Sequence, residues 1–316
     1  MDKLLRFQPV YQPRVWGGRA LADHLGRTLP DGGPIGESWE IVDRPEAQSI
    51  DPDTSKTLRQ LLTENAEAIM GPEFDPKQPF PILVKWLDCK DRLSLQVHPP
   101  EQVAARLGGE PKTECWYIAD ATREAALIVG LRNGVSRTEF ERAISEERLE
   151  PLLHRFAVQQ GQSILLESGR LHAIDAGNLI LEIQENSDTT YRVYDWGRKG
   201  LDGKPRELHV EESLQSIDFD DFEPQPNAPN TAPGEYLIAD CDQFQLRQVN
   251  LEAGSKLTLP AHTEPTIISM IDGTAIDEAT GASYARGDNL LSPWCRETTL
   301  VAKTAVSLLV TDRFIT

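Results

Sequence analysis

Cysteine is scarce in this sequence, and no two cysteines stand in a metal-binding pattern. The 316 residues include 4 cysteines, at positions 89, 115, 241 and 295, and none has CxxC spacing. This argues against a zinc site built on thiolates. The N-terminus lacks the apolar core of a secretory signal peptide, and disulfides form only in oxidising compartments. We therefore expect a cytoplasmic protein with reduced, mostly buried thiols.

Positive charge and long apolar runs are scarce as well. The 32 Lys and Arg residues are set against 50 Asp and Glu residues, which gives a formal net charge of −18. This balance argues against nucleic acids and anionic membranes as partners. No run approaches the roughly 18 apolar residues that a membrane helix needs. An anionic substrate would be repelled by the overall field, so cations would have to be placed locally at its site.

The sequence consists largely of short strand patterns separated by glycines. Helical periodicity is limited to residues 57–70 and to a helix that Ser136 and Glu139 open with a capping-box pattern and that we expect to run towards Leu153. Many short strands with two modest helical segments predict a mainly β fold, either a barrel or a jelly roll.

We expect two domains joined by a linker. Residues 223–234 are rich in Pro and Asn, which is typical of a linker. Beyond it, short strand patterns are again separated by glycines, as in the first part of the chain. The predicted domains are therefore residues 1–222, which would carry the catalytic site, and residues 235–316, a second barrel of similar build.

The segment from Ser94 to Pro99 carries the first candidate site residues. In a strand, Ser94, Gln96 and His98 share one face, while the aliphatic residues between them share the other. A hydroxyl, an amide oxygen and an imidazole on one face are half of a metal or ligand site. The alternative is an ordinary solvated strand face.

The chain has only 6 histidines, so partners for His98 can be enumerated. His98, Glu114 and His172 would supply two nitrogens and a carboxylate, and Gln96 would add a neutral oxygen. Such a set suits zinc and also accepts other first-row divalent ions. A surface carboxylate for Glu114 and a core histidine bonded to the backbone for His172 remain open alternatives.

Three charged residues interrupt apolar strand patterns. Arg192 is costly if buried alone, so it should meet either a bound anion or an interior carboxylate such as Asp195. Glu182 is likewise costly if buried alone, so its negative charge should meet a cation. Lys85 either reaches water or faces a polar site.

Taken in order, these motifs resemble the short bacterial form of type I mannose-6-phosphate isomerase, a zinc enzyme family of the cupin superfamily. The resemblance covers about residues 7–220 well and the remainder loosely. It rests on four segments: Ser94–Pro99, Lys112–Glu114, Gly169–Ala173 and the segment around Arg192. It implies two cupin-type β barrels (jelly rolls), the first with short helical insertions and the second degenerate and free of metal.

The resemblance also implies a role for each candidate residue. One zinc ion per chain would be held by four ligands: Gln96, His98, Glu114 and His172. Arg192 would act at the reacting end of the sugar. Glu182 falls on an active-site position and is the candidate base, with a metal-bound water or Asp195 as alternatives. The positions associated with the substrate phosphate are Ser94, Lys85 and Lys112.

The implied activity is the interconversion of mannose 6-phosphate and fructose 6-phosphate through an enediol, a step of carbohydrate metabolism. The partner would be a small sugar phosphate. Two alternatives stay open. One is another cupin metalloenzyme, such as an iron oxygenase or an isomerase of a different sugar phosphate. The other is a non-catalytic sugar-phosphate sensor, which would bind the sugar without turnover. The sequence leaves the oligomeric state open.

Overall fold

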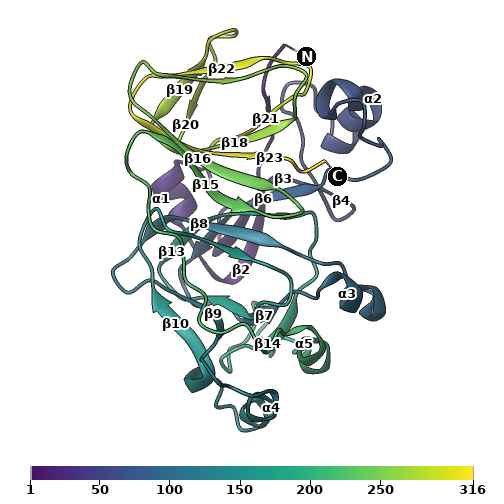
Figure 1. The fold of residues 1–316 in the computed structure, drawn as a ribbon, viewed down its shortest axis with the longest axis vertical. Helices are drawn as coiled ribbons and strands as arrows, with labels where there is room; N and C mark the ends of the chain where they lie inside the picture. Colours follow the sequence, from purple (N-terminus) through teal and green to yellow (C-terminus); the bar gives the residue numbers. More distant parts are fainter. Residues whose placement is uncertain (1, 316) are drawn as a thin grey trace. The chain divides into compact units, whose positions relative to one another are not determined.

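The computed structural model describes residues 2–315, which fold mainly into β strands (Figure 1). The chain divides into two compact units. One unit comprises Tyr11–Ser38 and Trp86–Ala228, and the other takes the residues up to Val10, Trp39–Lys85 and the residues from Pro229 onward. The expected division at residues 223–234 stays a prediction. Every helix in the described part is too short or too polar to span a bilayer.

The unit with Trp86–Ala228 is built on two sheets. A five-stranded sheet has the order β10-β9-β12-β7-β14, and a six-stranded sheet has the order β11-β8-β13-β6-β3-β2. The strands of the first are Leu153–Ala157 (β10), Ala126–Leu131 (β9), His172–Ile174 (β12), Leu95–Val97 (β7) and Tyr191–Tyr194 (β14). Those of the second are Ser163–Leu166 (β11), Glu114–Ala121 (β8), Asn178–Glu185 (β13), Ile82–Cys89 (β6), Ile35–Ile41 (β3) and Val10–Gly18 (β2).

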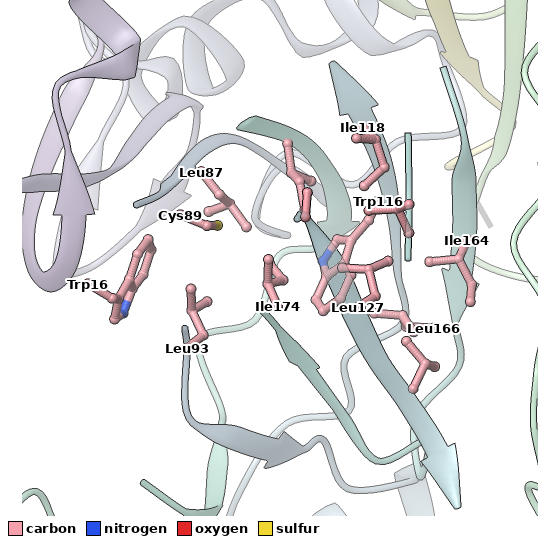
Figure 2. Close-up of a cluster of buried hydrophobic side chains, with 14 residues drawn as sticks. Trp16, Leu87, Cys89, Leu93, Trp116, Ile118, Leu127, Ile164, Leu166 and Ile174 are labelled. Atoms are coloured by element: carbon pink, nitrogen blue, oxygen red, sulfur yellow. The ribbon is translucent and has the colours of Figure 1, made fainter. Parts of the chain in front are cut away.

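A hydrophobic core joins the inner faces of these two sheets (Figure 2). Leu127 of β9 and Ile174 of β12 meet Trp116 of β8 and Ile164 of β11 in one buried cluster. Burying each such side chain contributes about 1.5–3 kcal/mol. This core fixes which side chain of each strand points inward.

A second cluster covers the outer face of the five-stranded sheet. Leu95 and Val97 of β7 pack there with Phe140 of helix α4 (Arg137–Ser145), beside helix α5 (Val210–Ser216). Figure 1 shows both helices next to the strands of this sheet. Because Leu95 and Val97 point outward, their neighbours Ser94, Gln96 and His98 point inward. The predicted alternation is confirmed, but both faces of the strand are covered.

The helix expected from Ser136 towards Leu153 was predicted too long. Ser136 does cap α4, since its hydroxyl accepts a hydrogen bond from the backbone N–H of Glu139 at 3.2 Å. However, α4 ends at Ser145, and a short 3-10 turn (Glu150–Leu152) leads into β10. Residues from Leu153 onward pair with β9 instead, which satisfies their backbone groups in the sheet.

The other unit has its own sheets and core. One sheet has the order β1-β21-β18-β23-β16-β15, and the other has the order β17-β22-β19-β20. Side chains from both sheets pack together in one hydrophobic cluster. The first sheet consists of Leu5–Arg6 (β1), Asn289–Ser292 (β21), Thr266–Asp272 (β18), Val306–Asp312 (β23), Gln245–Leu251 (β16) and Gly234–Asp240 (β15). The second consists of Lys256–Leu259 (β17), Thr298–Ala302 (β22), Thr274–Asp277 (β19) and Ser283–Ala285 (β20). Asp43–Arg44 (β4) pairs with Ala47–Gln48 (β5).

The remaining helices are short and end at glycines. Thr57 caps α2 (Leu58–Met70) with the reciprocal bonds of a capping box to Gln60. The helix predicted at 57–70 is confirmed, but it is kinked at Asn65, whose φ of −141° and ψ of 32° are not helical. Helices α1 (Ala20–Leu25) and α3 (Glu101–Leu107) each end at a glycine with positive φ.

Candidate metal centre and active site

Three inward-facing side chains converge between the sheets: His98 after β7, Glu114 at the start of β8 and His172 at the start of β12. Their donor atoms lie within 4.8 Å of one another, and all three side chains are buried. His98 Nε2 lies 3.7 Å from Glu114 Oε2, and His172 Nε2 lies 3.7 Å from Glu114 Oε1. Within residues 2–315, this is the one group of three or more His, Cys, Asp or Glu side chains that could hold a metal ion.

Backbone carbonyls fix the orientation of both imidazoles. His98 Nδ1 lies 2.8 Å from the carbonyl oxygen of Thr189, and His172 Nδ1 lies 2.8 Å from that of Arg170. A carbonyl can only accept, so each Nδ1 carries the hydrogen and each Nε2 keeps its lone pair towards Glu114. This arrangement is typical of histidines that bind metals through Nε2.

Both imidazoles are neutral in this environment. Burial, reinforced by the charge of Lys112, lowers the pKa of His98 to about 3. Burial also lowers the pKa of His172. Two neutral imidazoles and one carboxylate are the donors that zinc and other first-row divalent ions accept. The residues present therefore fit a metal ion.

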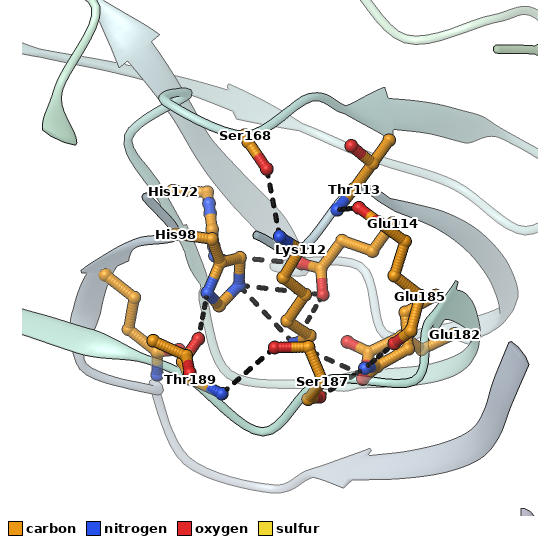
Figure 3. Close-up of polar contacts among 12 residues, drawn as sticks. His98, Lys112, Thr113, Glu114, Ser168, His172, Glu182, Glu185, Ser187 and Thr189 are labelled. Carbon is orange, nitrogen blue, oxygen red and sulfur yellow. Dashed lines mark hydrogen bonds and ion pairs between the residues drawn. The ribbon is translucent and has the colours of Figure 1, made fainter. Parts of the chain in front are cut away.

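Lys112 lies at the same centre (Figure 3). Its Nζ is 2.7 Å from Glu114 Oε2, 3.4 Å from His98 Nε2 and 4.0 Å from Glu182 Oε1. Burial favours the neutral amine, but the charges of Glu114 and Glu182 outweigh it and raise the pKa of Lys112. Burial likewise opposes the ionised form of Glu114, yet the charge of Lys112 holds its pKa well below the ordinary value. The centre is thus a buried ion-pair cluster with a fixed cation.

Glu182 is held from the neighbouring strand. The indole Nε1 of Trp116 donates a hydrogen bond to Glu182 Oε2 at 2.9 Å. The same indole meets the ring of His172 edge-on, with centroids 5.4 Å apart. Trp116 stands two residues after Glu114 and therefore lies on the same, inward face of β8, but its contact with Glu182 could not be predicted from spacing.

Ser94, Gln96 and Arg192 form a polar chain beside the cluster. Ser94 Oγ accepts hydrogen bonds from Gln96 Nε2 at 2.9 Å and from Arg192 Nε at 3.3 Å. Gln96 pairs with His172 on one side and with Arg192 on the other, which brings the three side chains together. Arg192 Nη1 also donates to the carbonyl of Glu207 at 2.8 Å. Burial, together with the nearby charge of Arg206, lowers the pKa of Arg192.

Comparisons with known proteins decide the family. A family model described as phosphomannose isomerase type I, catalytic domain, matches residues 4–114. Mannose-6-phosphate isomerase ManA of Bacillus subtilis (strain 168) is 35% identical over 302 residues, which cover 92% of this chain and 93% of that protein. This chain belongs to the type I mannose-6-phosphate isomerase family.

Two further relatives of this isomerase agree. The putative mannose-6-phosphate isomerase YvyI of Bacillus subtilis (strain 168) is 40% identical over 213 residues, 66% of each chain. The crystal structure of mannose 6-phosphate isomerase from Bacillus subtilis matches with a TM-score of 0.83 at 30% identity and covers 98% of this chain and 99% of that one. The predicted family, its isomerase class and the mainly β, cupin-type fold are confirmed.

Two further predicted residues, Asp195 and Lys85, also make contacts with residues outside the cluster. Asp195 accepts hydrogen bonds from Arg198 Nε at 2.8 Å and from Arg206 Nε at 2.7 Å, so its carboxylate is engaged by these arginines. Lys85 lies on β6, the strand beside β13, and its ammonium lies 5.0 Å from the ring centroid of Trp39. The phosphate role assigned to Lys85 stays a prediction, as do the roles of the other site residues.

Proposed function

We propose that this isomerase interconverts mannose 6-phosphate and fructose 6-phosphate, through an enediol, with one zinc ion per chain. The observation that carries the proposal is the buried cluster of two neutral imidazoles and a carboxylate, with Lys112 and Glu182 at its edge. A mannose 6-phosphate isomerase solved with zinc and yttrium has this fold, with a TM-score of 0.75 at 16% identity, which makes zinc the first metal to test. We also propose that the reaction takes place in the cytoplasm, as expected from the sequence.

Four residues would hold the ion: Gln96, His98, Glu114 and His172. Gln96 would bind through its amide oxygen, because its amide nitrogen donates to Ser94. A divalent cation at this place would polarise the carbonyl of the sugar and offset the negative charge that develops on its oxygen.

The remaining chemistry falls to the side chains around the cluster. Isomerisation moves a proton between C1 and C2, and Glu182 is the proposed base for that transfer. Arg192 would set a fixed positive charge near the reacting oxygen, where dry surroundings strengthen it. The proposed phosphate anchors are Ser94, Lys85 and Lys112, which would hold the reacting carbons in register. Local cations would thus offset the repulsion between an anionic sugar and an acidic protein.

Metal analysis combined with turnover tests this proposal. Purified protein should contain one zinc ion per chain and convert mannose 6-phosphate to fructose 6-phosphate. Chelation should abolish turnover, and added zinc should restore it. His172→Gln should lose both the metal and the activity, whereas His154→Gln, in β10 and hydrogen-bonded to Gln225, should keep both. Binding of the sugar phosphate without conversion would identify a sensor instead and overturn the proposal.

A further inference from the structure

Trp116 is a buried tryptophan whose only polar side-chain atom is directed at the proposed base. Its Nε1 lies 2.9 Å from Glu182 Oε2, and the exposed fractions of the two residues are 2% and 4%. We propose that Trp116 is a positioning residue, which holds the Glu182 carboxylate in the orientation needed for proton transfer. This inference rests on the proposed isomerase function and on Glu182 as its base.

The backbone makes this contact specific. Strands β8 and β13 are antiparallel neighbours, and Trp116 stands directly opposite Glu182 in their register. Side chains in such a pair have Cβ atoms about 4.5–5.5 Å apart on the same face of the sheet. Here that face is the inner one, so both side chains point between the sheets. The hydrogen bond therefore follows from the strand register rather than from a flexible loop.

Packing restricts the indole to one orientation. Trp116 belongs to the core between the sheets, with Leu127 and Ile164 (Figure 2). Its ring lies at 89° to that of His172. A large ring fixed on several sides cannot turn without opening a cavity, which costs several kcal/mol. The direction of its N–H is consequently set by the core.

The chemistry of the indole suits a positioning role. An indole N–H only donates and does not titrate in the physiological range, so it neither competes for a proton nor changes charge. A buried carboxylate needs such donors, because a buried acceptor without a hydrogen bond is destabilising, and more so when it is charged. Glu182 Oε2 is bonded to Trp116, while Oε1 lies 4.0 Å from Lys112 Nζ. The two oxygens thus have different partners, and the hydrogen bond from Trp116 restrains the orientation of the carboxylate.

A spectroscopic experiment tests the contact independently of activity. The chain has 6 tryptophans, so ¹⁵N-tryptophan labelling gives a small set of indole resonances. Trp116→Phe and Trp16→Phe identify two of them by loss of a signal. Glu182→Gln should shift the Trp116 resonance and leave that of Trp16, which lies in the same cluster but on β2. A Trp116 resonance that Glu182→Gln does not move would overturn the inference.

Kinetics then test the positioning role. Trp116→Phe should lower kcat about tenfold, equivalent to about 1.4 kcal/mol, with KM and zinc content unchanged. In a Glu182→Gln background the same substitution should cost nothing further, because it acts through Glu182. Trp16→Phe, the matched core control, should leave kcat within about twofold.

The outcomes separate the two claims. Wild-type turnover with an unchanged kcat in Trp116→Phe, or a loss that adds fully to that of Glu182→Gln, refutes the positioning role alone. Absence of turnover in the zinc-loaded wild type refutes the proposed function, and the positioning role with it, even if the indole resonance responds to Glu182→Gln.

Discussion

Replacing Lys112 by Met should destabilise the metal-free protein far more than a lysine substitution ordinarily does. The ammonium lies 2.7 Å from Glu114, and both side chains are almost fully buried. Removing one partner of a buried ion pair leaves an uncompensated charge, which costs about 3–5 kcal/mol. Here Glu182, at 4.0 Å, loses a neighbour as well. We therefore expect a loss in this range in the unfolding free energy of chelator-treated protein at pH 7.

The dependence on pH follows from the depressed pKa of Glu114. Burial opposes ionisation, but Lys112 lowers the pKa well below the ordinary value of 4.5. A carboxyl with a lowered folded-state pKa contributes stability above its unfolded pKa, and this is lost as the pH falls through the folded value. The difference between wild type and Lys112→Met should therefore be largest at neutral pH and shrink below about pH 4.5.

Urea unfolding of chelator-treated protein, followed by circular dichroism, measures this loss. Lys56→Met is the matched control, because Lys56 pairs with Glu64 at the surface and such pairs contribute about 0–1 kcal/mol. The double variant Lys112→Met/Glu114→Gln should recover part of the loss, since it removes both charges. A Lys112→Met protein no less stable than Lys56→Met would refute the buried ion pair.

Three further predictions address the metal, a charge network and the outer core. His98→Gln should raise the dissociation constant for zinc more than about 100-fold, measured by competition with a chelator; a change below about tenfold would contradict its role as a ligand. Burial opposes ionisation of Asp175, but Arg92 and Arg155 lower its pKa. Asp175→Asn should therefore lower the free energy of unfolding by about 1–3 kcal/mol at pH 7 and by much less below pH 3.8. Urea titrations at the two pH values measure both losses. Phe140→Ala should lower the unfolding free energy by about 3–5 kcal/mol while the folded fraction keeps its zinc, and a loss below about 1 kcal/mol would contradict its place in the core.

The strands and the inward residues could be predicted because their signals are local. Alternation alone placed Ser94, Gln96 and His98 on one face, and helical periodicity predicted α2 at residues 57–70. The end of α4 could not be found in this way. Residues after Ser145 retain apolar spacing, and only pairing with β9, a tertiary contact, turns Leu153–Ala157 into a strand.

The geometry of the centre depends on contacts across strands, which spacing does not encode. The sequence supplied His98, Glu114 and His172 as candidates, and the structure brings them together. The sequence could not show that Lys112 pairs with Glu114, because that pairing depends on burial and on strand register. The contact between Trp116 and Glu182 was missed for the same reason, since the strand pairing of β8 with β13 decides it.

X-ray absorption at the zinc edge tests the metal centre most directly. Purified protein loaded with one equivalent of zinc should show nitrogen and oxygen ligands at about 2.0–2.2 Å with the outer-shell scattering of two imidazoles. In His172→Gln, which should purify without zinc, the centre reloaded with substoichiometric zinc at high protein concentration should lack the signal of one imidazole. Sulfur at about 2.3 Å, or a wild-type spectrum unchanged by His172→Gln, would contradict a centre formed by His98, Glu114 and His172.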